Sequence, residues 1–240
     1  MDSLRIPIIG VAVLLLAACG AVQTPQTPST QGTGSGAAAE ESRASLEARA
    51  KKGDAGAQFD LGAIYHDGEG VPKDLKLARE WFLKAAKQGE SRAQFNLGIM
   101  YYVGEGVKQD YGQAKEWFQK AADSGNMRGQ FNLAVIFHRG EGVKQDFAKA
   151  LALFTLAGKQ GFSEAQFNVG VMYAKGEGVP QDIGKAYAWF TLSRKGGNPR
   201  APEVIKNLER ELKPEQLTLV KKMATALEKE ISSRPGVQGE

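Results

Sequence analysis

The two histidines are the first candidates for chemistry, because an imidazole can bind a metal or move a proton near neutral pH. His66 and His138 are the only histidines in the 240 residues, and they occupy the same position in a segment that recurs along the chain. One copy of the segment lies between them, which separates them by roughly 20 Å if successive helices pack at their usual distance. That separation is too long for shared metal coordination. We therefore predict no metal site, and we place both side chains at a helix end or on a binding face.

A second candidate is a column of glutamates in the tetrapeptide Gly-Glu-Gly-Val, which occurs four times. Adjacent members would lie roughly 10 Å apart on an exposed edge, so we expect a solvated edge and not a catalytic carboxylate pair. The tetrapeptide is not a phosphate-binding loop, because it follows a predicted helix and the chain contains neither GxGxxG nor GxxxxGK[ST]. The glutamates are Glu69, Glu105, Glu141 and Glu177.

The composition and charge exclude further classes. Lys and Arg number 31 and Asp and Glu number 27, so the net charge of +4 is too small and too dispersed for a nucleic-acid surface, although the pI is near 9.0. A single cysteine rules out an internal disulfide framework. Together these features predict a protein that is not an enzyme, with no cofactor, no metal and no nucleic-acid partner.

The single cysteine follows a short apolar segment at the N-terminus. Residues 6–18 are 13 uncharged residues, which is shorter than the roughly 20 that a membrane-spanning helix needs and typical of a signal peptide. Residues 16–19 (Leu-Ala-Ala-Cys) resemble the lipobox of bacterial lipoproteins. This resemblance implies a lipoprotein signal peptide over residues 1–18 and a lipid anchor on Cys19. The alternative is an ordinary cleaved signal in which Cys19 is incidental. Gly20 in place of aspartate implies, by the same resemblance, sorting to the outer membrane.

Residues 19–39 are predicted to form a disordered tether. Residues 20–39 have no charge and no aromatic side chain, and they are rich in Thr, Pro, Gln and Gly. Such a segment cannot bury enough apolar surface to offset its chain entropy. A chain of this length reaches about 25 Å on average, which would hold the folded part close to a membrane.

The rest of the chain is dominated by an internal repeat. Gly-Glu-Gly-Val recurs every 36 residues, and aligning on it divides residues 53–196 into four repeats: 53–88, 89–124, 125–160 and 161–196. Each half-repeat has the apolar spacing of a helix. The first glycine of the tetrapeptide is predicted to end the first helix in a left-handed conformation. An aspartate is predicted to cap the start of the second helix, at Asp74, Asp110, Asp146 and Asp182.

Three glycines fall in the middle of the predicted first helices, at Gly62, Gly98 and Gly170. A glycine in a helix interior costs about 1 kcal/mol relative to alanine. We attribute these three positions to a close approach of the second helix. Since neither helix of a pair can bury its apolar face alone, neighbouring repeats must stack.

These features together resemble the Sel1-like repeat family, a relative of tetratricopeptide repeats. The resemblance rests on the recurring Ala, Leu-Gly, Tyr, Gly-x-Gly-Val, Asp, Ala, Trp and Ala-Ala, and it covers residues 53–196. The third repeat departs from it at Gly129, Ala134 and Leu153. The resemblance implies an all-α fold: a right-handed superhelical α-solenoid of helix-turn-helix repeats.

Further helices are expected at both ends of the repeats. Residues 40–52 are predicted to form an N-terminal capping helix, and residues 197–232 to form C-terminal capping helices, the last of which begins at Pro214. Residues 233–240 are predicted to be a disordered tail.

The first helix of each repeat also carries apolar residues outside its main stripe. By resemblance to tetratricopeptide repeats, these first helices line a concave face, and an aromatic groove edged by arginine would suit a peptide. The alternative is that the phenylalanines pack between repeats. The predicted groove residues are Phe59, Phe95, Phe131, Phe167, Ile99, Val135, Val171, His66, Tyr102, His138, Arg92 and Arg128.

These expectations predict a monomeric, non-enzymatic scaffold or adaptor that is lipid-anchored in the cell envelope, at the outer membrane facing the periplasm. It would bind a protein or peptide of the envelope in its concave groove. Two alternatives remain: a cell-wall hydrolase related to β-lactamases or penicillin-binding proteins, and a passive structural component of an envelope or polysaccharide-export complex. The hydrolase lacks support in the residues, because Ser-x-x-Lys does not occur in the chain.

Overall fold

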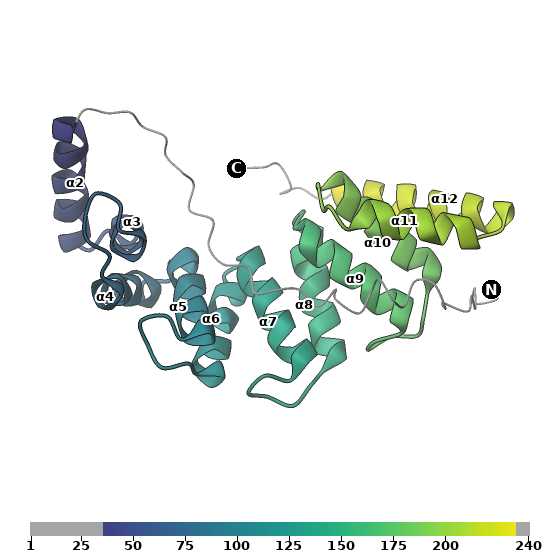
Figure 1. Ribbon diagram of the computed structural model, residues 1–240, viewed down its shortest axis with the longest axis horizontal. Coiled ribbons are helices and arrows are strands. Elements are labelled where there is room, and N and C mark those ends of the chain that lie inside the picture. The colour runs from purple at the N-terminus through teal and green to yellow at the C-terminus, as the bar shows by residue number, and fades with distance from the viewer. Residues whose placement is uncertain (1–35, 234–240) are drawn as a thin grey trace. The chain divides into compact units, whose positions relative to one another are not determined.

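The computed structural model describes residues 36–233, and their side chains from residue 43 onward (Figure 1). All regular structure in this range is α-helical, which confirms the predicted all-α class. The predicted signal peptide, Cys19, and nearly all of the tail lie outside the described residues. The helices are α2 (Gly36–Lys51), α3 (Ala55–Asp67), α4 (Leu75–Lys87), α5 (Ser91–Val103), α6 (Tyr111–Asp123), α7 (Met127–Arg139), α8 (Phe147–Lys159), α9 (Ser163–Lys175), α10 (Ile183–Lys195), α11 (Ala201–Glu211) and α12 (Pro214–Ser232).

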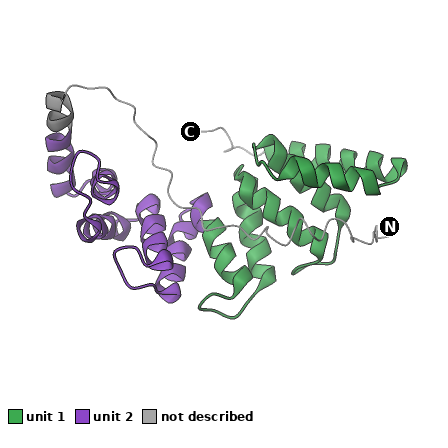
Figure 2. Ribbon diagram, in the orientation of Figure 1, with its two compact units in different colours: residues 1–21, 130–240 green, residues 22–129 purple. Residues whose placement is uncertain are grey.

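The described chain divides into two compact units, residues 36–129 (unit 2) and residues 130–233 (unit 1), as Figure 2 shows. The division falls within α7. In unit 2, α3 packs on α4 and α5 packs on α6, and α4 also contacts α5. In unit 1, α9 packs between α8 and α10. Each unit is therefore built from helix pairs, and the packing of α4 on α5 and of α8 on α9 joins one pair to the next.

The loop inside each pair is fixed by its glycines and its aspartate. Gly68 ends α3 in the left-handed region with a φ of 77°, and Gly104 ends α5 with a φ of 79°. The N–H of Asp74 donates to the carbonyl of Tyr65 across the loop (2.8 Å), while its carboxylate accepts the N–H of Leu77 (2.9 Å) and caps α4. All four predicted aspartates cap a second helix in this way, which confirms the prediction.

The glycines in the middle of the first helices provide room for an aromatic ring, as predicted. A β-carbon on Gly62 would lie 2.6 Å from Cδ1 of Phe82, and one on Gly170 would lie 2.7 Å from Cε1 of Phe190. Such distances are shorter than van der Waals contact, so a larger residue would force the helices apart. Gly98 approaches Phe118 of α6 in the same manner. The three phenylalanines are fully buried.

A buried glutamine joins each of three first helices to the helix before it. Nε2 of Gln58 donates to the carbonyl of Ala50 (3.0 Å), and Gln94 does the same to Ala86 (3.2 Å). In unit 1, Gln166 donates to Gly158 (2.9 Å). These amides are buried, so each bond satisfies a polar group that would otherwise be costly to remove from water.

The helices at the ends differ in one respect from the prediction. Helix α2 begins at Gly36, four residues before the expected start at residue 40, so residues 36–39 are helical and do not belong to the tether. The added residues are Gly-Ala-Ala-Ala, and alanine has the highest helix propensity. Helix α12 has Pro214 at its start, as predicted, and packs along α10.

Candidate interaction surface

The predicted groove phenylalanines are mostly core residues, which corrects the groove assignment. Phe95 is 3 % exposed, Phe131 is fully buried and Phe167 is 1 % exposed. Each packs its ring against the phenylalanine of the second helix in the same repeat, with centroids 5.2–6.0 Å apart. These rings fill the interior of a helix pair and are inaccessible to a partner.

The aliphatic part of the predicted groove is also buried. Ile99, Val135 and Val171 are at most 5 % exposed, and Tyr102 packs edge-on against Tyr111 with its side chain in the interior. The reason is general: a first helix is contacted by more than one neighbouring helix, so nearly its whole circumference is apolar. These four residues are therefore not groove residues.

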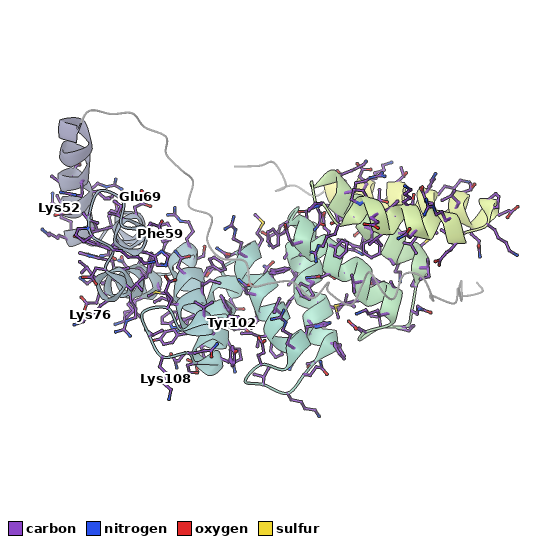
Figure 3. All side chains as sticks on the ribbon, in the orientation of Figure 1. Lys52, Phe59, Glu69, Lys76, Tyr102 and Lys108 are labelled. Atoms are coloured by element: carbon purple, nitrogen blue, oxygen red, sulfur yellow. The ribbon has the colours of Figure 1, made fainter. Side chains whose placement is uncertain are left out.

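Phe59 is the exception among the phenylalanines. It lies in α3 (Figure 3) and is only partly buried, with its ring 5.8 Å from that of Phe82. The guanidinium of Arg92, on the following first helix, lies over the ring at 4.3 Å from its centroid. In this cation–π contact, the face of the Phe59 ring lies against the charged, exposed side chain of Arg92.

Arg92 is the centre of an exposed charged cluster. Its side chain is 54 % exposed and pairs with Glu90 (Nε to Oε1, 2.9 Å), and Asp60 lies 4.0 Å away. The hydrogen bond from Arg92 holds the pKa of Glu90 below its ordinary value. Partial burial raises the pKa of Asp60, and Arg92 opposes that shift. We call Phe59, Asp60, Glu90 and Arg92 the charged edge of unit 2.

The corresponding edge of unit 1 has an arginine that the sequence analysis missed. The guanidinium of Arg200 lies over the ring of Phe167, 4.3 Å from its centroid, as Arg92 does over Phe59. Arg200 is 108 residues from Arg92, which is three repeat lengths, so the spacing itself was a usable signal. Two equivalent positions lie between them, and the first of these, the predicted groove residue Arg128, is partly buried.

The histidines form ion pairs that join consecutive repeats. Nε2 of His66 lies 3.1 Å from Oε2 of Glu105, and its Nδ1 lies 2.6 Å from Oδ1 of Asp67. Partial burial raises the pKa of Glu105, but hydrogen bonds from Lys73 and His66 outweigh it and hold the pKa below its ordinary value.

Unit 1 contains an equivalent pair. Nε2 of His138 lies 2.8 Å from Oε2 of Glu177, and Lys175 lies 3.5 Å from the same carboxylate. The hydrogen bond from His138 lowers the pKa of Glu177 against the effect of partial burial. Of the four glutamates that were expected to form a solvated edge, Glu105 and Glu177 are instead partners of the preceding histidine, whereas Glu69 is exposed as expected.

These arrangements are built for ion pairing and binding. His66 lies between two carboxylates and His138 contacts that of Glu177, and the described residues contain no group of three or more side chains suited to hold a metal ion. Within the same residues, no helix has both the length and the apolar character needed to cross a bilayer.

Comparison with known proteins agrees with this architecture. The family model of the Sel1 repeat matches residues 55–90, 91–126, 128–162 and 163–198. These matches begin two or three residues after the repeats delimited from the sequence, and together they cover more than half of the chain. No curated protein matches the chain.

Two solved structures resemble the chain over most of its length. A Sel1 repeat protein from Oxalobacter formigenes is 36% identical, with a TM-score of 0.66 over 70% of this chain and 49% of that one. The protective antigen c5321 of uropathogenic Escherichia coli, described as displaying an SLR fold, is 28% identical, with a TM-score of 0.51 over 83% of this chain and 53% of that one. The chain thus spans about half the length of each. With four matched repeats in an all-α helical repeat solenoid, the chain belongs to the Sel1 repeat family.

Proposed function

We propose that this protein is a membrane-anchored scaffold of the cell envelope that binds a partner protein or peptide at the charged edge of unit 2. Sel1 repeat proteins are scaffolds that typically mediate protein–protein interactions, and they are generally not enzymes. A binding role for this chain is therefore the expectation of its family. The binding site at the charged edge and the membrane anchor go beyond what the family implies.

The observation that carries the proposal is the accessible pairing of Arg92 with Phe59. The other predicted phenylalanines are buried, whereas this ring is partly exposed beside an arginine that is more than half exposed. Arginine and aromatic residues are enriched among the residues that contribute most to protein interfaces. Asp60 and Glu90 supply acceptors next to them, so one small surface offers apolar, cationic and anionic groups.

Photo-crosslinking in living cells tests this surface. A photoreactive residue at Asp60, which is exposed on α3, is compared with one at Gln119, which is exposed on α6 outside the charged edge. The proposal predicts a discrete adduct from position 60 and none from position 119, and mass spectrometry of the adduct then identifies the partner. Equal labelling from both positions, or labelling from neither, would contradict it.

The membrane anchor rests on the Leu-Ala-Ala-Cys sequence that ends at Cys19. Lipid chains on this cysteine would hold the protein at a bilayer, because each buried methylene contributes about 0.8 kcal/mol. Fractionation of cells that express Cys19→Ser should then move the protein from the membrane to the soluble fraction. A variant that stays in the membrane fraction would refute the anchor while leaving the charged edge to be judged by crosslinking.

A further inference from the structure

The second helices of the four repeats differ along one of their faces. Three positions follow each capping aspartate by two, six and ten residues, and this spacing of four places them on the same side of the helix. In α4 and α6 the middle position is a glutamate and the last is a lysine. In α8 and α10 all three positions are uncharged and the last is a leucine. We call them the α8 stripe (Ala148, Ala152, Leu156) and the α10 stripe (Gly184, Ala188, Leu192).

The α10 stripe is covered by α12, which packs on α10 (Figure 1). Ala188 is 2 % exposed and Leu192 is 8 % exposed. Gly184 is buried, and a β-carbon on it would lie 2.7 Å from Sδ of Met223 in α12. Ala188 shares a core cluster with Val220, a fully buried residue of α12. In this fold, a stripe of two small residues and a leucine is therefore a surface on which an amphipathic helix packs.

The α8 stripe has the same character but is open to solvent. Leu156 is 52 % exposed, and Ala148 and Ala152 are exposed as well. A single exposed leucine is common on protein surfaces. Here, however, three positions together match the covered stripe of α10, whereas the equivalent exposed positions of α4 and α6 carry charges. The residues of α8 thus suit a covered helix face, although nothing among residues 36–233 covers it.

The charges of α8 favour a helix of another protein over a second copy of this chain. Helix α8 contains two lysines and no acidic residue. If two copies paired through their α8 stripes, the same surface would lie on both sides of the contact. Lysines would then face lysines with no carboxylate from either helix, and like charges across an interface are unfavourable. A partner helix that carries a carboxylate avoids this repulsion.

Helix α12 shows the polar chemistry of such a covering helix. Its Glu228 pairs with Lys195 at the end of α10, and its Glu230 lies 3.6 Å from Lys159 at the end of α8. Helix α12 thus combines an aliphatic face with carboxylates that reach the lysines of second helices. Lys149 lies directly after the first residue of the α8 stripe, and its side chain is 64 % exposed. It is available to a carboxylate of a helix that packs there.

We infer that the α8 stripe binds an amphipathic helix of a partner protein. The partner helix has aliphatic residues at the spacing of Val220, Ala224 and Leu227 in α12, and at least one carboxylate beside them. The two small residues of the stripe let the helices approach closely, and Leu156 packs between the side chains of the partner. The α8 stripe belongs to unit 1 and the charged edge belongs to unit 2, so the inference does not depend on the proposed function.

A peptide with the sequence of α12, residues 214–232, tests the inference as a stand-in for the partner helix. It carries a fluorophore and a hydrocarbon staple between positions 218 and 222, which are exposed in α12, so that it is helical before it binds. The α10 stripe is already occupied by the chain's own α12, whose tethering gives it a far higher effective concentration there. Fluorescence anisotropy with the full chain should show saturable binding. The same peptide with Val220→Glu and Leu227→Glu should not bind.

Variants of the full chain locate the binding. Ala152→Glu/Leu156→Lys introduces the residues that α4 and α6 have at these positions, so it should fold normally. It should weaken peptide binding at least tenfold and leave the melting temperature unchanged. The same exchange on α10, Ala188→Glu/Leu192→Lys, should lower the melting temperature, because α12 covers those residues. Glu116→Lys/Lys120→Glu on α6 is the matched control, and it should change neither property.

Several outcomes would overturn the inference. Anisotropy that does not saturate, or binding that persists in Ala152→Glu/Leu156→Lys, would mean that the α8 stripe does not bind a helix. Sedimentation of the parent chain as a dimer that this variant abolishes would assign the stripe to a second copy and refute a separate partner. An unchanged melting temperature in Ala188→Glu/Leu192→Lys would remove the precedent of α12 on α10. Crosslinking at position 60 judges the charged edge alone, so the two proposals can fail independently.

Discussion

His66 is bonded to Glu105, which lies 39 residues further along the chain, and the same spacing joins His138 to Glu177. In each pair, a histidine near the end of one first helix meets the glutamate of the Gly-Glu-Gly-Val loop in the next repeat. The contact therefore connects consecutive repeats through their loops, in addition to the packing of their helices. The partial burial of both partners makes each pair less sensitive to salt than an exposed pair.

The pairs predict a loss of stability in acid. Both glutamates have a pKa below the ordinary 4.5, so the folded state binds protons less readily than the unfolded state does. Their contribution is present above about pH 4.5 and is lost as the pH falls through the lowered values. Urea denaturation from about pH 6 to pH 3 should show a smaller loss of stability in Glu105→Gln/Glu177→Gln than in the parent.

The difference should be modest, about 1 kcal/mol or less in total, because both carboxylates remain partly exposed. Glu69→Gln is the matched control. Glu69 occupies the same loop position but is exposed and lacks a histidine partner from a preceding repeat. If Glu69→Gln flattened the pH profile as much as the double variant did, the two histidine pairs could not be the cause.

Phe131 should contribute to stability as a core residue. Its ring is fully buried between Phe154 and Phe162, with centroids 5.3 and 5.1 Å away. Phe131→Ala should lower the free energy of unfolding by about 3–5 kcal/mol, the usual cost of deleting a buried aromatic side chain. Phe59→Ala should cost clearly less, because Phe59 is only partly buried. Chemical denaturation of both variants checks the order, and equal costs would contradict the core assignment.

Gly170→Ala should destabilise the protein even though alanine is the better helix former. The new methyl group would lie 2.7 Å from Cε1 of Phe190, and such overpacking typically costs about 1–3 kcal/mol. Phe190→Leu in the same chain should reduce the additional cost of the alanine, since a smaller side chain relieves the contact. Gly56→Ala is the control, because its β-carbon would make only an ordinary contact. A stabilising effect of Gly170→Ala in thermal melting would show that the helices can separate freely.

Asp182 should act as a helix cap. Its carboxylate accepts the N–H of Lys185 (2.9 Å) at the start of α10. Asp182→Ala should lower the free energy of unfolding by about 1 kcal/mol. Asp182→Asn should keep most of the parent's stability, because asparagine is an equally good cap. Thermal melting distinguishes the two variants. If both lost the same amount, the charge and not the hydrogen bond would be the important property.

Local chemistry is the part of the structure that the sequence predicted well. Gly68 in the left-handed region, Asp74 as a cap and Gly62 against an aromatic ring each depend on a requirement that few residue types can meet. Their recurrence every 36 residues adds independent support to each prediction. These positions mark where each helix begins and ends, so they also predicted how the helices form pairs.

The accessible surface was predicted less well, because periodicity identifies an apolar face but not what covers it. Phe95 and Phe59 occupy equivalent positions in the repeat, yet the first is buried and the second is partly exposed. The pairing of His66 with Glu105 was missed for another reason. Aligned repeats compare equivalent positions, whereas this contact joins different positions of consecutive repeats.

The buried glutamines have a consequence for how such a chain can change over time. Each acceptor of these bonds is a main-chain carbonyl, as for Gln58, Gln94 and Gln166. Because every amino acid has such a carbonyl, the bond requires no particular side chain in the preceding helix. A duplication or deletion of one whole repeat would recreate the same bond at the new boundary. The gene can therefore gain or lose whole repeats of 36 codons, because the hydrogen bond between the glutamine and the preceding helix forms again at each new boundary.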